Sequence, residues 1–219
     1  MTKSLARNLN GLEIEGKSSL KTYIKDNDIN FDNLRTMDLV IENIKSKDTR
    51  FLLLASEKSM FGFLMDIIKN ELEKMNSNSD DNNIINEVVY MGSPFKGDKM
   101  NISYQTEMIM NVEKSVAEDK AIILSDLEQI YSTFYDLFNQ NYINKDGKKY
   151  CFISHGANIQ KLAYVNENTK FIILVDKKNL REQKIPFLSR FEKHIISFDS
   201  LLDEKDKEKS EKIFKFSKI

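Results

Sequence analysis

Short apolar runs alternate along this chain with longer stretches in which apolar residues recur at helical spacing. A continuous apolar run bounded by polar residues is typical of a strand that is buried on both faces. The runs that fit this description lie at residues 50–55, 87–91, 121–124, 170–175 and 195–198. Strands that alternate with helices predict βαβ units and a mainly parallel sheet.

The stretches between these runs predict the helices. Leu64, Ile68 and Leu72 recur at intervals of four, which places them on one face of a helix. We expect helices at residues 1–46, 58–75, 102–118 and 127–139, and from residue 203 onward. A hairpin is expected from residues 150–153 and 160–165, a polar loop at residues 76–83 and a basic loop at residues 145–149.

Composition narrows the class of protein. The chain has 219 residues, 41% of them hydrophobic and 31% charged, with a net charge of −1, which is typical of a folded domain and does not favour nucleic acid as a partner. One cysteine, Cys151, and two histidines exclude an internal disulfide framework and a Cys- or His-rich metal site. No stretch predicts a membrane helix or a signal peptide. We therefore expect a cytoplasmic protein without a metal of its own.

Three blocks of sequence carry a family resemblance. Residues 121–150 include Ile-Ile-Leu-Ser-Asp-Leu-Glu-Gln-Ile-Tyr, residues 170–199 include Ile-Pro-Phe-Leu-Ser-Arg-Phe-Glu-Lys-His, and residues 89–95 read Val-Tyr-Met-Gly-Ser-Pro-Phe. In their order along the chain, these blocks resemble the mysterin family of giant RING-bearing E3 ubiquitin ligases, which carry a dynein-like row of AAA+ modules. The segments at residues 7–11 and 38–54 look like the join between two such modules.

The resemblance implies an α/β fold of the AAA+ (P-loop NTPase-like) class, with a parallel five-stranded sheet flanked by helices. Residues 1–46 would be the end of the preceding module's helical lid, residues 47–199 an AAA+ core, and residues 200–219 the start of a truncated lid. The chain is then expected to be a fragment of a larger protein, and the RING of the family lies outside it.

The first candidate site follows the first strand. An AAA+ ATPase cradles phosphates there with a glycine-rich loop that ends in Lys-Ser or Lys-Thr. Lys58 and Ser59 imitate the end of that loop, but the glycines are missing, the connection is short, and Glu57 adds a negative charge. The alternative is an ordinary helix start with Ser56 as its N-cap.

Two further strand ends carry acidic candidates. An active module ends its third strand with Asp-Glu, for Mg²⁺ and for the attacking water; here Ser125 stands in the expected aspartate position, and Asp126 and Glu128 are staggered from it. Asp126 is alternatively a cap for the following helix. Asp176 stands at the sensor position after the fourth strand, where a charged loop is an equally good interpretation.

Arg190 is the last candidate. It follows Pro-Phe-Leu-Ser at the end of a short helix, just before the final strand. In the AAA+ architecture this element lies at the edge of the module, where an arginine finger stabilises charge on the neighbour's γ-phosphate. Arginine suits phosphate better than lysine does. The alternative is a surface salt bridge, for instance to Glu192.

Together these features favour a non-hydrolysing AAA+ module that supplies Arg190 to a neighbouring ATP site. No cofactor is expected in this module, and ATP with Mg²⁺ is expected in the neighbouring one. The partners would be adjacent AAA+ modules and, through the parent protein, the ubiquitin machinery. Two alternatives stay open: a divergent active ATPase that uses Lys58, Ser59, Asp126 and Glu128, and a stand-alone α/β interaction protein.

Overall fold

A parallel five-stranded sheet forms the centre of the molecule. The computed structural model describes residues 35–46, 49–78, 87–156 and 159–201. The strands of the central sheet lie in the order β2-β3-β7-β1-β8, and each pairs in parallel with its neighbours. Their bounds are β1 Leu52–Ser56, β2 Glu87–Met91, β3 Lys120–Ser125, β7 Lys170–Asp176 and β8 Glu192–Ile195. The predicted α/β fold with a parallel five-stranded sheet is confirmed.

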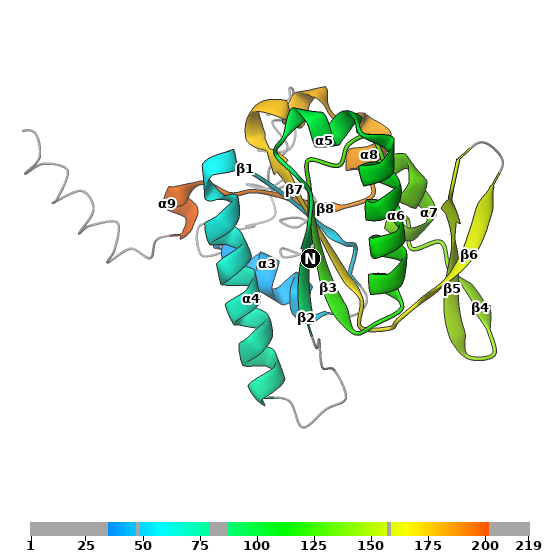
Figure 1. Ribbon diagram of the computed structural model, residues 1–219. Coiled ribbons are helices and arrows are strands. Elements are labelled where there is room, and N and C mark those ends of the chain that lie inside the picture. The colour runs from blue at the N-terminus through cyan, green and yellow to red at the C-terminus, as the bar shows by residue number, and fades with distance from the viewer. Residues whose placement is uncertain (1–34, 47–48, 79–86, 157–158, 202–219) are drawn as a thin grey trace, which may run out of the picture.

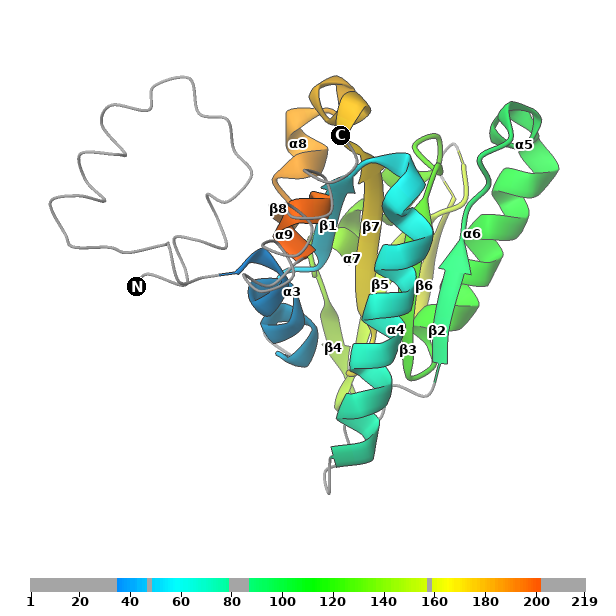
Figure 2. The same cartoon turned by 90° about the vertical axis from the view of Figure 1, so that its left-hand side faces the viewer.

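One face of this sheet is covered by two helices (Figure 2). They are α3 (Thr36–Lys45) and α4 (Phe61–Asn78), the second of which follows a 3-10 helix, η1 (Lys58–Met60). Every second residue of the strands packs against the apolar faces of α3 and α4, because successive side chains in a strand point to opposite faces of the sheet. The buried core on this side includes Val40, Leu54, Leu64, Ile68 and Ile123.

The opposite face carries a larger, aromatic core. It is covered by α6 (Ile102–Val116), by the 3-10 helix η2 (Tyr131–Phe134) and by the short α7 (Tyr135–Phe138). Asn101 begins α6, because its side chain accepts hydrogen bonds from the Ser103 and Tyr104 backbone N–H groups. Phe138 lies centrally, with its ring 5.1 Å from that of Phe191 and 5.8 Å from that of Phe171 between centroids.

A second, antiparallel sheet lies outside α6 and α7 (Figure 1). It has three strands in the order β4-β5-β6, with bounds β4 Ile143–Lys145, β5 Lys148–Ser154 and β6 Gln160–Val165. The hairpin of β5 and β6 is confirmed. The expected basic loop at residues 145–149 was wrong, since both of its ends belong to strands and only Asp146 and Gly147 form the turn. Both residues have positive φ, at 52° and 73°, which suits a tight antiparallel turn.

Other boundaries differ from expectation. The expected helix at residues 127–139 is broken into a turn, η2 and α7, because bulky aromatic residues there fill the core beneath the small sheet and helix propensity yields to packing. The last strand begins three residues before the expected Ile195. The helix at residues 61–78 continues into the expected polar loop. Three parts of the expectation lie outside the described residues: the remainder of that loop, residues 1–34 of the helical segment expected at 1–46, and the tail from residue 202.

The remaining short helices connect the strands at their ends. They are α5 (Lys96–Met100), η3 (Lys177–Glu182), α8 (Ile185–Leu188) and α9 (Phe198–Leu201). Among the described residues, no helix combines the length and apolar character needed to cross a membrane.

A buried polar contact ties α3 to the edge strand β8. The Asn43 side-chain amide donates to the Glu192 carboxylate at 2.7 Å and to the Arg50 carbonyl at 3.0 Å. The other carboxylate oxygen of Glu192 lies 2.9 Å from Nε2 of His194, which is fully buried. Hydrogen bonds of this kind are needed to offset the cost of burying such groups.

Candidate functional site

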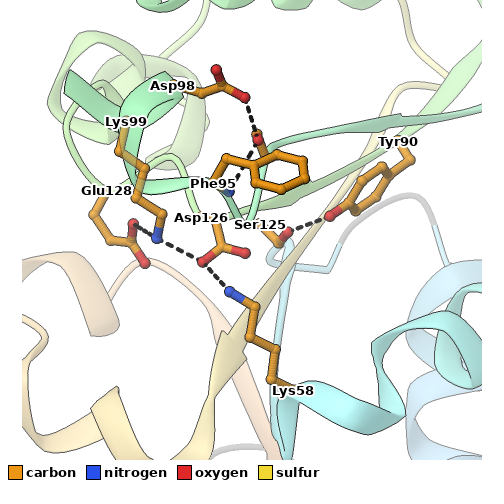
Figure 3. Close-up of polar contacts among 9 residues, drawn as sticks. Lys58, Tyr90, Phe95, Asp98, Lys99, Ser125, Asp126 and Glu128 are labelled. Carbon is orange, nitrogen blue, oxygen red and sulfur yellow. Dashed lines mark hydrogen bonds and ion pairs between the residues drawn. The ribbon is translucent and has the colours of Figure 1, made fainter. Parts of the chain in front are cut away.

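Four charged residues meet at the carboxyl edge of the central sheet, where ligands of open parallel sheets bind. Nζ of Lys58 lies 2.8 Å from Oδ1 of Asp126, and Nζ of Lys99 lies 2.7 Å from the same oxygen. Lys99 also lies 3.7 Å from the Glu128 carboxylate. Figure 3 shows the two lysines reaching Asp126 from η1 and α5. We call Lys58, Lys99, Asp126 and Glu128 the charged cluster.

The backbone of this edge is set by close contacts between neighbouring strands. Gly92, just after β2, has a φ of 143°, and a Cβ there would lie 2.0 Å from the carbonyl oxygen of Ser125. Only glycine fits such an approach. Oη of Tyr90 lies 2.6 Å from Oγ of Ser125 (Figure 3), which is fully buried. Ser125, in the position where an aspartate was expected, is therefore part of the packing between β2 and β3.

Asp126 has an unusual backbone. Its φ is 55°, a left-handed conformation that aspartate tolerates better than most residues. The alternative interpretation, in which Asp126 caps a following helix, is wrong: a turn follows β3, and the next helical residue is Tyr131. The left-handed turn directs its carboxylate to the two lysines instead.

The charges of the cluster are mutually adjusted. Burial alone would raise the pKa of Asp126, but hydrogen bonds from Lys58 and Lys99 outweigh it and lower the pKa below its usual value. For Lys99, burial lowers the pKa, while contacts with Asp126 and Glu128 raise it more. Both groups are therefore charged around neutral pH.

The connection from β1 to η1 is very short. The strand ends at Ser56 and the 3-10 helix begins at Lys58, so Glu57 alone joins them. A phosphate-binding loop of the P-loop type needs several residues between two glycines. This connection is one residue long and contains no glycine. Ser59 lies exposed in the same turn. Ser56 was expected to be the N-cap, but it is the last residue of β1, and Glu57 holds the cap position.

Asp176 lies beside this edge without joining the charged cluster. It ends β7, next to Ser56 of β1. Its carboxylate accepts a hydrogen bond from the Lys178 backbone N–H at 3.0 Å and so caps η3.

In the described residues there is no group of three or more His, Cys, Asp or Glu that could hold a metal ion. Burial raises the pKa of the Cys151 thiol to about 12, which leaves it protonated and unreactive.

Arg190 lies at the opposite edge of the sheet, just before the amino end of β8. Its guanidinium carbon lies 3.9 Å from the centroid of the Tyr135 ring in α7, and Nη1 donates to the Pro186 carbonyl of α8. Within the described residues, Nε is buried and has no hydrogen-bond partner. Arg190 is half-buried against its own domain and is not brought near Lys58 or Asp126.

Comparison with known proteins decides the family. The model for the RNF213 AAA domain matches residues 41–202. The chain belongs to the RNF213 AAA domain family. Human E3 ubiquitin-protein ligase RNF213 is 26% identical over 121 residues, which cover 53% of this chain. The mouse protein of the same name is 26% identical over 120 residues.

The relatives of this AAA domain are much longer than the chain, which spans 2% of the length of the human protein and of the mouse protein. Among solved structures, a DNA polymerase III gamma subunit-related protein from Thermotoga maritima aligns with a TM-score of 0.44 at 8% identity. That alignment covers 79% of this chain and 48% of the other.

Lys99 is the member of the site that sequence reasoning missed. It lies in α5, in the connection that follows β2. The signal available was its place in the chain: in a parallel sheet, residues that follow neighbouring strands meet at one edge. Tyr135, the ring that holds Arg190, was also missed, because a contact between α7 and the turn after α8 has no pattern along the sequence.

Proposed function

We propose that this AAA domain is a structural module that neither binds nor hydrolyses ATP. The observation that carries the proposal is the single-residue connection between β1 and η1. Phosphates are held in P-loop proteins by the backbone N–H groups of a long glycine-rich loop. A connection made of Glu57 alone offers neither those N–H groups nor the space between two glycines, and it adds a negative charge.

The charged cluster supports the same conclusion. In an active module an acid at the end of the third strand serves Mg²⁺. Here Asp126 is only 11% exposed in its side chain and already contacts two ammonium groups. A metal ion would have to displace a lysine from a charge-assisted hydrogen bond. The cluster supplies its own positive charge in place of the ion.

Calorimetric titration of the chain with ATP and Mg²⁺ tests this function. We expect no binding heat at millimolar nucleotide, and no shift in the unfolding temperature, because a bound ligand would stabilise the fold. Circular dichroism and a cooperative unfolding transition serve to show that the titrated chain is folded. Saturable, Mg²⁺-dependent binding would contradict the proposal.

A divergent active ATPase is the second candidate. One observation favours it: Lys58, Asp126 and Glu128, which the alternative requires, do converge at one edge of the sheet. In that case ATP would displace Lys58 from Asp126, and binding would disappear in Lys58→Ala. The same titration with this variant separates the two candidates, since the structural module binds no nucleotide in either form.

We also propose that Arg190 acts as an arginine finger on the ATP site of a neighbouring module. Its support is its place at the sheet edge and the weak hold of Tyr135 and Pro186, which leaves it free to turn outward. In a protein that contains both modules, Arg190→Ala should slow hydrolysis at the neighbouring site roughly 10³-fold. Arg181→Ala, a change to an exposed arginine in η3, is the control. An unchanged rate in Arg190→Ala would exclude the finger.

Ubiquitin ligase activity is the activity named for the human and mouse relatives. We assign it, within this proposal, to the parent protein, in which this domain serves as one member of a row of AAA modules. Cytoplasmic location belongs to the same proposal.

A further inference from the structure

The small sheet has one face in the core and one in solvent. Cys151, Ile153, Ala163 and Val165 point inward and are buried in the aromatic core. Because successive side chains of a strand alternate between faces, the residues between them point away from the domain. Figure 1 shows that β4, β5 and β6 lie outermost, beyond α6 and α7, so their second face meets no other described element.

The middle of that second face is apolar, although an antiparallel sheet with one solvated face ordinarily carries polar side chains there. At one end the register adds the polar pair Ser154 and Gln160. Strand register places Ile143 opposite Tyr150, Tyr150 opposite Tyr164, and Phe152 opposite Leu162. Ile143 is 43% exposed, Phe152 38% and Leu162 42%. We call these five residues the outer face. A contiguous exposed apolar patch, unlike a single exposed side chain, marks an interaction site.

Two lysines extend the outer face at one end. Lys145 and Lys148 are paired across β4 and β5, in the same alternation as Ile143 and Tyr150. Both are exposed, and within the described parts of the chain neither has a carboxylate at ion-pair distance. The nearest acid along the chain, Asp146, lies in the turn between them. Asp119 and Glu167 line a hollow together with Lys148. This end of the outer face therefore presents two lysines that are close to acids but, in the described residues, are not in ion pairs with them.

The geometry favours a protein over a nucleic acid as the partner. Bases stack on open aromatic faces, but the Tyr150 and Tyr164 rings pack against each other, with centroids 5.8 Å apart. Nζ of Lys148 covers the Tyr164 ring, 5.6 Å from its centroid. Within the outer face, the most exposed side chains of the three with a stated exposure are the aliphatic Ile143 and Leu162, which suit apolar side chains of a protein.

We propose that the outer face is a docking surface for a protein segment that carries apolar residues flanked by Asp or Glu. Ile143, Phe152 and Leu162 would contact the apolar residues, and Lys145 and Lys148 the carboxylates. Charge at the rim of an interface selects the partner and its orientation more than it adds affinity. The proposal is independent of the charged cluster, which lies at the carboxyl edge of the central sheet.

Photo-crosslinking tests the proposal in cells that make the full protein. Phe152 is replaced by a benzophenone amino acid, and the crosslinked peptides are identified by mass spectrometry. We expect discrete protein partners whose crosslinked segments are acidic and apolar. The double variant Lys145→Glu/Lys148→Glu should reduce the crosslink yield about tenfold, as expected when two attractive contacts become repulsive. The control variant Lys177→Glu/Lys178→Glu makes the same change in net charge on η3 and should leave the crosslink yield unchanged.

The probe at Phe95, which is 70% exposed beside α5, is the positional control. Identical partners at Phe95 and Phe152, crosslinks to nucleic acid, or a yield that does not respond to Lys145→Glu/Lys148→Glu would each overturn the proposal. So would the absence of any discrete crosslink. Because every substituted side chain is exposed, all variants should keep the wild-type unfolding temperature. If Lys145→Glu/Lys148→Glu does not, Leu162→Asp replaces it as the change that disrupts the outer face.

Discussion

The two edges of the central sheet hold positive charge in different ways. At the carboxyl edge, Lys58 and Lys99 contact the same oxygen of Asp126, at 2.8 and 2.7 Å. At the amino edge, Arg190 lies over the Tyr135 ring and donates to a carbonyl, and among the described residues its buried Nε has no partner. The lysines are neutralised where they lie, whereas Arg190 has no carboxylate beside it in the part of the chain that the structure describes.

This difference separates a fixed cation from a movable one. A lysine that leaves Asp126 exposes a partly buried carboxylate and gives up a charge-assisted hydrogen bond. Arg190, which is half-buried, gives up a cation–π contact of about 1 kcal/mol and one neutral-acceptor hydrogen bond when it leaves the tyrosine ring. The fixed charges of Lys58 and Lys99 suit a structural role. The movable charge of Arg190 suits a role in which the side chain changes conformation to bind a partner.

The largest effect should come from Gly92→Ala, which disturbs the backbone under the charged cluster. Its new Cβ would lie 2.0 Å from the Ser125 carbonyl oxygen, at a φ of 143°. We expect a loss of about 3 kcal/mol or more in the free energy of unfolding, measured by chemical denaturation. Gly97→Ala is the matched control: nothing lies within 4 Å of its Cβ, and alanine favours a helix. Equal stability of the two variants would refute the close approach.

Asp126→Ala should come next, because it leaves two ammonium groups close together without their carboxylate. We expect a loss of about 2 kcal/mol. Asp126→Asn separates charge from backbone, since asparagine also tolerates the φ of 55°. The folded pKa of Asp126 is lowered, so its contribution is present above the unfolded pKa of about 4 and is lost as pH falls through the folded pKa. The difference in the free energy of unfolding between the wild type and Asp126→Asn should therefore shrink in acid. A difference that stays constant from pH 7 to pH 2 would argue against the ion pairs.

A smaller difference should separate the two lysines. The Lys99 side chain is 25% exposed and that of Lys58 is 42% exposed, so solvent screens Lys58 more strongly. We expect Lys99→Ala to lower stability by about 1 kcal/mol and Lys58→Ala by about half as much. The folded pKa of Lys99 is raised, so its contribution holds below the unfolded pKa and disappears as pH rises through the folded one. A larger loss in Lys58→Ala would reverse the order proposed for the cluster.

The effect of Arg190→Ala on the stability of the domain should lie in the same range as the effects of the two lysine variants. Its ring contact and one carbonyl hydrogen bond predict a loss of about 0.5–1 kcal/mol, seen as a small shift in thermal unfolding. Tyr135→Leu should produce a similar loss from the other side of the contact. A loss as large as that of Asp126→Ala would show that Arg190 is a fixed structural residue and would weaken the distinction between the two edges.

The sheet could be predicted from the sequence because its strands are continuous apolar runs. Leu52 to Ala55 and Phe171 to Val175 are buried on both faces, and burial of that kind leaves an unmistakable pattern. The region from Leu127 to Asn139 was misjudged for the opposite reason. Its aromatic residues recur at helical spacing, yet they serve a core under a second sheet, and only the tertiary structure decides between a helix and a chain of turns.

The candidate site was predicted in part. Lys58 follows β1, and Asp126 and Glu128 follow β3, with β7 between these two strands. Parallel topology brings residues that follow the strands to the same edge of the sheet. Their pairing with Lys99 depends on the path of α5, which Gly92 and the Ser93–Asp98 hydrogen bond of 2.5 Å direct toward β3. No spacing in the sequence encodes that path.

The hydrogen bonds of Asn43 have a mechanical consequence. They fasten α3 to Glu192 in β8 and to the Arg50 carbonyl, and the Arg50 side chain in turn donates to the Ser189 carbonyl at 2.9 Å. Two side chains thus span the distance from the helix to the turn that carries Arg190. A displacement of α3 would have to break these bonds or carry the turn with it, so we expect the position of α3 to influence the turn that carries Arg190.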